Sequence, residues 1–139
     1  MPFLETAVEI AREAGALVAN YHQRHIPFET KGEFDLVTEA DRSSEKLIVE
    51  RLRSHFPAHA IVAEEGGGHE SASEYRWFID PLDGTTNFAH GFPMFCISMG
   101  PVSYTHLDVY KRQPLGSTHM NIGGKRFFSI NLTLRTGTQ

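Results

Sequence analysis

Four acidic residues in the middle of the chain have the types and spacing to bind a divalent cation. Glu64 and Glu65 follow a short apolar run, Asp80 follows an aromatic-rich run, and Asp83 comes three residues later. Carboxylates at the ends of neighbouring strands repel one another unless positive charge lies between them. Such hard oxygen ligands suit Mg²⁺, Mn²⁺ or Ca²⁺, whereas the region has no His or Cys pair at zinc spacing. The loop also lacks the acidic pattern of an EF-hand.

A turn beginning at the second acidic run could hold a metal and a phosphate together. Its sequence is Asp80-Pro81-Leu82-Asp83-Gly84-Thr85-Thr86. The proline fixes the chain so that two Asp side chains face one site, with the Leu82 carbonyl between them. Gly84 lets a ligand approach the backbone closely. Thr85 and Thr86 offer hydroxyl groups, and a helix that began here would offer free N–H groups to phosphate.

Each of these patterns also has a structural interpretation. Asp-Pro-x-Asp-Gly is a common turn composition, and Glu64-Glu65 alone fits a solvated strand end. Thr38 and Asp41 fit a helix capping box with Asp in place of Glu. The three glycines at 66–68 indicate a surface loop rather than a phosphate cradle, because no Lys-Ser/Thr pair follows them.

Hydrophobic periodicity predicts two helices that must support this region. Apolar residues at steps of three and four predict one helix over residues 3–24 and a second from near Thr38 to about His55. Between the helices, residues 28–31 could form a short strand, followed by a turn at Gly32-Glu33.

Three apolar or aromatic runs predict strands next to the acidic residues. They cover residues 60–63, 75–79 and 92–100. The middle strand is expected to end at Asp80, and Trp77 within it is expected in the core. Residues beyond 100 have no clean period of 2 or 3.6.

Composition narrows the class of protein. The chain has 139 residues and a formal net charge of −4, with 40% hydrophobic and 22% charged residues, which is typical of a globular domain. The acidic balance argues against sequence-independent nucleic-acid binding. The single cysteine, Cys96, fits a small buried residue and indicates a reducing compartment. Neither a signal peptide nor a membrane span is visible, so we expect a soluble cytoplasmic protein without a membrane partner.

In combination, the motifs closely resemble the inositol monophosphatase family, including its SuhB-like members. The resemblance covers residues 1 to about 100 and rests on segments in a fixed order. They are Asp35-Leu36-Val37-Thr38-x-x-Asp41, Glu64-Glu65, Trp77-x-Ile79-Asp80-Pro81-Leu82-Asp83-Gly84-Thr85-Thr86-Asn87-Phe88 and His90-Gly91-Phe92-Pro93. The family implies a layered α/β fold of the inositol monophosphatase and fructose-bisphosphatase type, incomplete in this chain. It also implies Mg²⁺-dependent hydrolysis of a phosphate monoester.

The resemblance implies a role for each matching residue. The metal ligands would be Glu64, Asp80, the Leu82 carbonyl and Asp83. The attacking water would be held by Glu64 and Thr85, supported by Asp41. The substrate phosphate would be bound by Gly84 and Thr85, beside Asp83. Supporting positions would be Lys31, Glu65 and Thr86. A complete site would hold two or three Mg²⁺ ions.

The sequence departs from the family after Met99-Gly100. The family continues with a second half that supplies a further metal-binding aspartate in a Trp-Asp motif, but this chain has no Trp after Trp77. Residues 102–113 resemble a translated sequencing adapter. We therefore expect residues 1–100 to be the N-terminal part of a phosphatase domain and residues 101–139 to be a tail foreign to the family. We also expect this fragment to be inactive alone.

The resemblance implies inositol monophosphate as the substrate, and a homodimer for the complete protein. Alternative substrates are fructose 1,6-bisphosphate, histidinol phosphate or a nucleotide bisphosphate, because most substrate contacts would lie in the absent half. An alternative of another class is a SuhB-like binding partner of the transcription machinery, which the acidic charge does not support. A metal-binding domain without catalysis is a third possibility. Thr85 and Asp41 argue against it, because a structural site need not orient a water.

Overall fold

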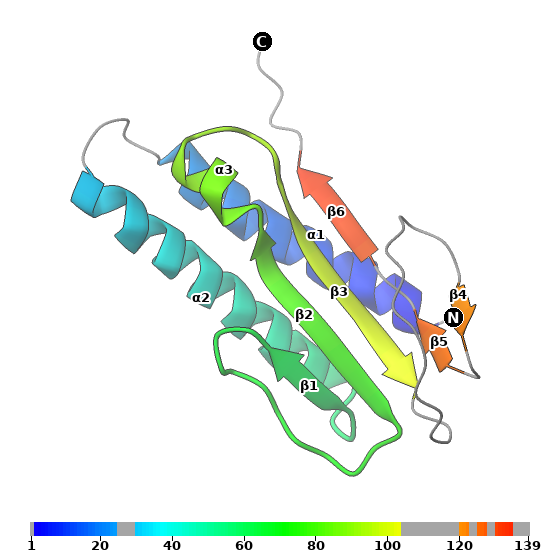
Figure 1. Ribbon diagram of the computed structural model, residues 1–139. Coiled ribbons are helices and arrows are strands. Elements are labelled where there is room, and N and C mark those ends of the chain that lie inside the picture. The colour runs from blue at the N-terminus through cyan, green and yellow to red at the C-terminus, as the bar shows by residue number, and fades with distance from the viewer. Residues whose placement is uncertain (1, 25–29, 104–119, 123–124, 128–129, 135–139) are drawn as a thin grey trace.

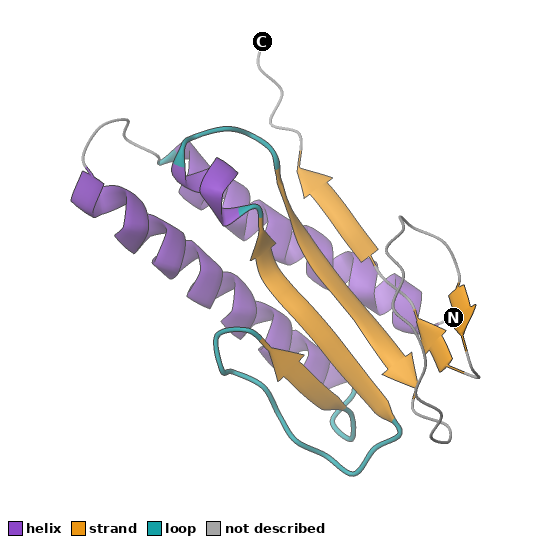
Figure 2. Cartoon of the chain, viewed as in Figure 1, coloured by secondary structure: helices purple, strands orange, loops and turns teal. Residues whose placement is uncertain are grey.

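The fold has two layers, with two long helices against one face of a mixed sheet (Figure 1). The computed structural model describes residues 2–24, 30–103, 120–122, 125–127 and 130–134. The helices are α1 (Pro2–Gln23), α2 (Thr30–His55) and the short α3 (Thr85–Ala89). The strands are β1 (Ala60–Ala63), β2 (Tyr75–Asp83), β3 (Phe95–Ser103), β4 (Met120–Ile122), β5 (Lys125–Phe127) and β6 (Ile130–Leu134). Figure 2 shows the short helix α3, which connects β2 to β3 in the chain.

The first helix confirms the sequence prediction, and the second begins earlier than predicted. The stripe of small residues on α1 is buried, from Ala7 to Val18. The predicted strand at 28–31 is wrong for its last two residues, which lie in α2, while residues 28–29 lie outside the described part. The turn at Gly32-Glu33 is also wrong, because α2 runs through it. One glycine costs a helix only about 1 kcal/mol, which the packing of a 26-residue helix can outweigh.

The earlier start of α2 also removes the predicted capping box. Thr38 and Asp41 lie inside the helix, so neither caps its N-terminus. The apolar stripe of α2 is as expected, with Ile48 and Leu52 fully buried and Phe56 packed at its end. A buried Asp41 in that stripe therefore needs another explanation than capping.

The sheet has the order β1-β2-β3-β5-β4, and β6 also pairs with β3. Strand β1 runs parallel to β2, whereas β2 and β3 are antiparallel. The prediction that β2 ends at Asp80 is wrong, because pairing with β3 continues to Asp83 through an irregularity in register. The next strand starts at Phe95 rather than residue 92 and continues to Ser103, because the segment before it forms α3 and a turn.

The core lies between the helices and the covered face of the sheet. Its largest fully buried side chains include Trp77, Phe88, Ile10 and Met99. The opposite face of β1 and β2 is more open, and Phe78 is 41% exposed there. Trp77 is buried as the sequence predicted.

His59 is tied to the core through Trp77. The Trp77 indole Nε1 donates a hydrogen bond to His59 Nδ1 at 3.1 Å. The His59 ring stacks on Phe56, with 5.0 Å between ring centroids and 5° between planes. Burial lowers the pKa of His59 below its usual 6.5, against an opposing effect of Glu74. The neutral imidazole is therefore the form that fits this site.

We expect acid to weaken the fold through His59. Its pKa is lower in the folded state, so the unfolded chain takes up the proton first and stability falls as pH drops below about 6.5. Urea unfolding followed by the fluorescence of Trp77, the single tryptophan, measures this loss. His59→Asn keeps an acceptor near Nδ1 without the titration and should show less acid destabilisation. Equal acid sensitivity in both proteins would contradict the assignment.

Candidate metal and phosphate site

Parallel pairing of β1 and β2 brings the two acidic runs to one edge of the sheet. Ala63 is paired with Ile79, so Glu64, the first residue after β1, lies beside Asp80, which is still within β2. Both carboxylates line a cavity of about 290 Å³ on the open side of the sheet. The predicted juxtaposition of the two acidic runs is therefore present in the structure.

An irregularity in β2 separates Asp80 from Asp83. The register with β3 shifts between these two residues, and Asp83 pairs with Cys96. The Leu82 backbone N–H lies 3.3 Å from Asp80 Oδ1, its acceptor within the turn. Bulges of this kind re-aim side chains next to functional sites. Asp80 and Asp83 therefore both belong to β2, and the irregularity between them changes the direction in which their side chains can project.

Cys96 on β3 contacts the site rather than the core alone. Its thiol donates a long hydrogen bond of 3.7 Å to Asp83 Oδ2. Burial and the neighbouring Asp83 raise the pKa of the Cys96 thiol to about 11, so it stays protonated as a donor. The expectation of a small buried residue is therefore incomplete, because Cys96 is only partly buried.

A short helix begins directly after the second aspartate. Gly84 precedes α3 with φ 90° and ψ 37°, a left-handed conformation that favours glycine. A Cβ there would lie 3.0 Å from the Met94 carbonyl oxygen. The first backbone bond of α3 runs from Phe88 N to Gly84 O at 3.0 Å. Thr85 and Thr86 precede that bond and are exposed, so their N–H groups have no acceptor within the helix.

Helix α2 contributes three buried polar residues to the region below the acidic segments. Asp41 is 9% exposed, Ser44 is 0% exposed and Glu45 is 4% exposed. Their spacing of three and four places them on one helix face. Ser44 Oγ donates a hydrogen bond of 2.8 Å to the Pro81 carbonyl. Sequence reasoning did not select Ser44 or Glu45, although polar residues one turn beyond Asp41 within an apolar stripe were a usable signal.

Burial and nearby carboxylates raise the pKa of two acidic residues of the region, Asp41 and Asp80. Burial first, and then Glu65, Asp80, Glu64 and Glu45, raise the pKa of Asp41 from 3.8 to about 7. Burial, with Glu64 and Asp83, also raises the pKa of Asp80, against a lowering hydrogen bond from the Leu82 backbone. This cluster of carboxylates therefore stores electrostatic repulsion that protons or cations can relieve.

The donor set at this edge fits a hard divalent cation. Asp41 Oδ1 is buried and has no hydrogen-bond partner within the described residues. Carboxylate oxygens that repel one another, one of them orphaned, are suitable ligands for Mg²⁺ or Mn²⁺. Among the described residues, no group of three or more His, Cys, Asp or Glu side chains is arranged to hold a metal ion by itself. The structure thus has acidic residues on one side of an open cavity, and its described residues do not enclose a metal site.

Of the predicted supporting residues, the structure describes the side chain of Glu65 but not that of Lys31. Glu65 is exposed, and its backbone N–H is bound by Glu45. Lys31 lies in α2, but its side chain lies outside the described part of the structure. The individual roles of the site residues stay predictions.

Loss of the Ser44 hydroxyl is expected to destabilise the fold. Ser44→Ala leaves the buried Pro81 carbonyl without this donor, which should lower the free energy of unfolding by about 1 to 3 kcal/mol. Chemical denaturation measures the change. Ser43→Ala is the matched control, because Ser43 on the same helix shares only a part-buried hydrogen bond with Tyr21. An equal effect of the two substitutions would contradict a special role for the Ser44 contact.

A search of the described helices found none with the length and apolar character needed to cross a membrane.

Comparison with known proteins connects this geometry to one family. The model of the inositol monophosphatase family matches residues 1–127. The chain is 39% identical over 135 residues to inositol monophosphatase 3 of Solanum lycopersicum, covering 93% of this chain and 47% of the relative. It is 47% identical over 103 residues to Nus factor SuhB of Pseudomonas aeruginosa, covering 70% of this chain and 38% of the relative. The chain thus spans less than half the length of these relatives.

A solved structure shares the fold as well as the sequence. The inositol monophosphatase of Anabaena (Nostoc) superposes with a TM-score of 0.59 at 44% identity, covering 72% of this chain and 34% of the other. The layered α/β fold and the N-terminal portion expected from the motifs are confirmed. With a family model that matches most of its residues, the chain belongs to the inositol monophosphatase family.

Proposed function

We propose that the whole protein hydrolyses a phosphate monoester with Mg²⁺, and that the substrate is inositol monophosphate. The observation that carries this proposal is the pairing of Ala63 with Ile79, which brings Glu64 and Asp80 to one edge. The raised pKa values of Asp41 and Asp80 support it, because a cation would relieve the repulsion that causes them. Family membership supports phosphatase chemistry in general.

The acidic residues would bind the cations, and one of them would also bind the attacking water. Glu64, Asp80, the Leu82 carbonyl and Asp83 would hold the cations. Bound Mg²⁺ would supply a water of lowered pKa and neutralise charge on the phosphate and the leaving oxygen. Glu64 would also hold the attacking water.

The start of α3 would hold the phosphate. The N–H groups of Gly84 and Thr85 would donate to its oxygens, in the way that helix N-termini bind anions. The Thr85 hydroxyl would contact the attacking water. The buried carboxyl of Asp41 would support that water without contacting the substrate. Lys31, Glu65 and Thr86 would support this arrangement, and no covalent intermediate is required.

Release of inorganic phosphate by the whole protein tests this function. We expect turnover of inositol monophosphate that requires Mg²⁺, and we expect Asp83→Asn to reduce it by about 100-fold or more. The 139-residue chain is expected to be inactive under the same conditions, since it spans less than half of its relatives. Near-normal turnover of Asp83→Asn at saturating Mg²⁺ would refute the site assignment.

A panel of substrates separates the possibilities within this reaction class. Fructose 1,6-bisphosphate, histidinol phosphate and a nucleotide bisphosphate are the alternatives to inositol monophosphate. The preferred substrate is the one with the highest kcat/KM. Faster hydrolysis of any of these three would replace inositol monophosphate in the proposal.

A second candidate function is binding to the transcription machinery in the manner of a SuhB protein. The name of the Pseudomonas aeruginosa relative, Nus factor SuhB, favours it. Pull-down with the whole protein carrying Asp83→Asn separates this role from catalysis. Retained binding by the inactive protein would support the second function, and the lack of any transcription component in the pull-down would remove it.

A further inference from the structure

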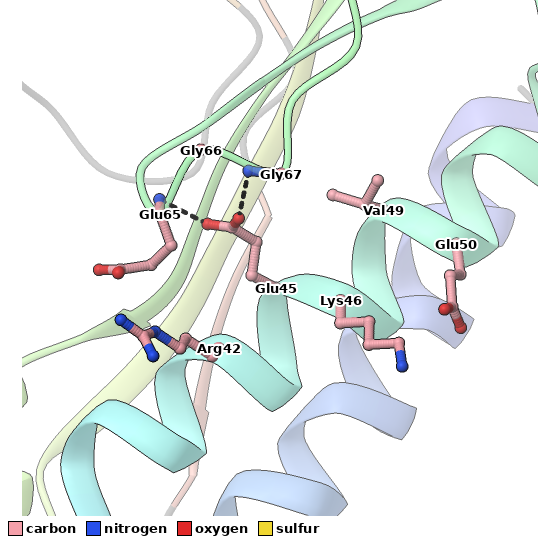
Figure 3. A pocket seen from close by; sticks show the side chains of 8 residues that line it. All are labelled: Arg42, Glu45, Lys46, Val49, Glu50, Glu65, Gly66 and Gly67. Carbon is pink, nitrogen blue, oxygen red and sulfur yellow. Dashed lines mark hydrogen bonds between the residues drawn. The ribbon is translucent and has the colours of Figure 1, made fainter. Parts of the chain in front are cut away.

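Glu45 joins α2 to the turn that carries the first acidic pair. Its side chain is nearly buried, with 4% exposed. Its Oε2 accepts a hydrogen bond from the Glu65 backbone N–H at 2.7 Å, and its Oε1 accepts one from the Gly67 N–H at 2.8 Å (Figure 3). Bonds from N–H groups to a charged carboxylate are about twice as strong as neutral ones. Both oxygens of one side chain therefore hold two N–H groups of one turn.

The glycines of the turn make this contact possible. A Cβ at residue 67 would lie 2.6 Å from Glu45 Oε1, and one at residue 68 would lie 2.7 Å from the Ile61 carbonyl oxygen. Between the two bound amides, Gly66 has a positive φ of 89°. The glycine run thus permits close approach of the turn to α2 and β1, and its exposed backbone is shaped around a carboxylate.

The start of the turn after β1 is held on both sides of Glu64. On one side β1 is paired with β2 as far as Ala63. On the other side Glu45 holds the amides of Glu65 and Gly67. Glu64 lies between these two anchors, and it lines the same cavity as Asp80. The position of the Glu64 carboxylate relative to Asp80 therefore depends on Glu45.

We propose that Glu45 is a positioning residue for the metal site, which holds the turn after β1 so that Glu64 and Asp80 can share a cation. The proposal rests on the proposed function, because it assigns Glu45 a role through Glu64 and not a direct contact with metal or substrate. Ser44, one position earlier, holds the Pro81 carbonyl of the other acidic segment. Neighbouring residues of α2 thus hold the two acidic segments in place.

Glu45→Gln is the primary test, with Mn²⁺ as the probe. A glutamine keeps the size of the side chain but can accept only through one oxygen. Mn²⁺ binding to the 139-residue chain is measured by calorimetry, and hydrogen exchange of the Glu65 and Gly67 amides is measured by NMR. We expect faster exchange of at least one amide and a Mn²⁺ dissociation constant raised by about 10- to 100-fold, as for other residues that orient metal ligands.

Glu50→Gln is the matched control. Glu50 lies on the same helix and is exposed. Together with Glu45 it lines a second cavity, of about 460 Å³, which is distinct from the cavity lined by Glu64 and Asp80. In Figure 3 its side chain points away from the turn. The control removes the same charge, so it should leave both amide exchange and Mn²⁺ affinity unchanged. A similar loss of Mn²⁺ affinity in the control would overturn the proposal, because general charge would then explain the effect.

A second variant keeps the experiment decisive if Glu45→Gln does not fold. Gly67→Ala leaves every charge in place and pushes the Glu45 carboxylate out of the turn, through the 2.6 Å contact. We expect weaker Mn²⁺ binding here too. Wild-type affinity in a folded Glu45→Gln or Gly67→Ala protein would overturn the positioning role alone. Failure of the whole wild-type protein to bind Mn²⁺ would instead overturn the proposed function, and the positioning role with it.

Discussion

Replacing Asp80 by asparagine is expected to abolish measurable Mn²⁺ binding to the chain. Asp80 lies between two other acidic residues. Glu64 is beside it on the neighbouring parallel strand, and Asp83 follows it in β2 after the irregularity in register. Burial raises the pKa of Asp80, and Glu64 and Asp83 raise it further. Residues that only support a ligand contribute about 10- to 100-fold to affinity, so removal of a direct ligand should exceed that range. Titration calorimetry measures the loss.

Glu9→Gln is the control for this substitution. Glu9 is exposed on α1 and its replacement removes one negative charge from the same chain. A specific site predicts near-normal Mn²⁺ binding in Glu9→Gln and none in Asp80→Asn. Equal affinities in the two variants would show that the cation responds to the net charge of −4 and not to a site.

Replacing Asp41 by asparagine is expected to stabilise the metal-free protein. The pKa of Asp41 is raised to about 7, first by burial and then by surrounding carboxylates. The folded state thus binds the proton more tightly than the unfolded state. The stabilisation is complete below the unfolded value of 3.8 and is lost as pH rises through about 7. At about pH 8 the variant, which carries no charge here, should be more stable by about 1 to 2 kcal/mol.

Urea unfolding with and without Mg²⁺ measures the effect of Asp41→Asn. The gain should disappear as pH falls below 3.8, because Asp41 is then protonated in both states. Mg²⁺ should reduce the gain, because bound cations relieve the repulsion in the wild-type protein. In the whole protein the same substitution should lower turnover. Glu50→Gln, on the exposed side of α2, serves as the control. A wild-type protein more stable than Asp41→Asn at about pH 8 would contradict the electrostatic account.

The parts of the fold that follow from local pattern could be predicted from the sequence. The helix α1 and the strand β1 have strong periodicity or a clear apolar run, and both lie where predicted. The meeting of Glu64 and Asp80 was expected because each follows an apolar or aromatic run that was predicted as one of two neighbouring strands, although β2 continues past Asp80. The family was identified from spaced motifs, and the family comparison confirms it.

The parts that depend on distant contacts could not be predicted. The Ser44 hydroxyl contacts a carbonyl 37 positions away, and the Glu45 carboxylate contacts an amide 20 positions away. Neither pair has a local signature. The start of α2 was missed because Gly32 is a poor helix residue, and local propensity gives way to the packing of a long helix. The extension of β2 to Asp83 depends on pairing with β3.

The acidic cluster matters because repulsion between its carboxylates is a property of the metal-free fold. Burial and like charges raise the pKa values of Asp41 and Asp80, while Ser44 and Glu45 hold the two segments against relaxation. A cation that neutralises these groups gains both direct coordination and the relief of that repulsion. This combination is the physical basis for a metal site at the edge of β1 and β2.

Paramagnetic broadening by Mn²⁺ in the NMR spectrum of the 139-residue chain is the most direct test of this claim. The account predicts that small amounts of Mn²⁺ selectively broaden the amide signals of Glu64, Asp80, Leu82 and Asp83. Signals from the N-terminal half of α1, away from this edge, should stay sharp. Broadening centred elsewhere, or no selective broadening at all, would contradict a metal site formed by these residues.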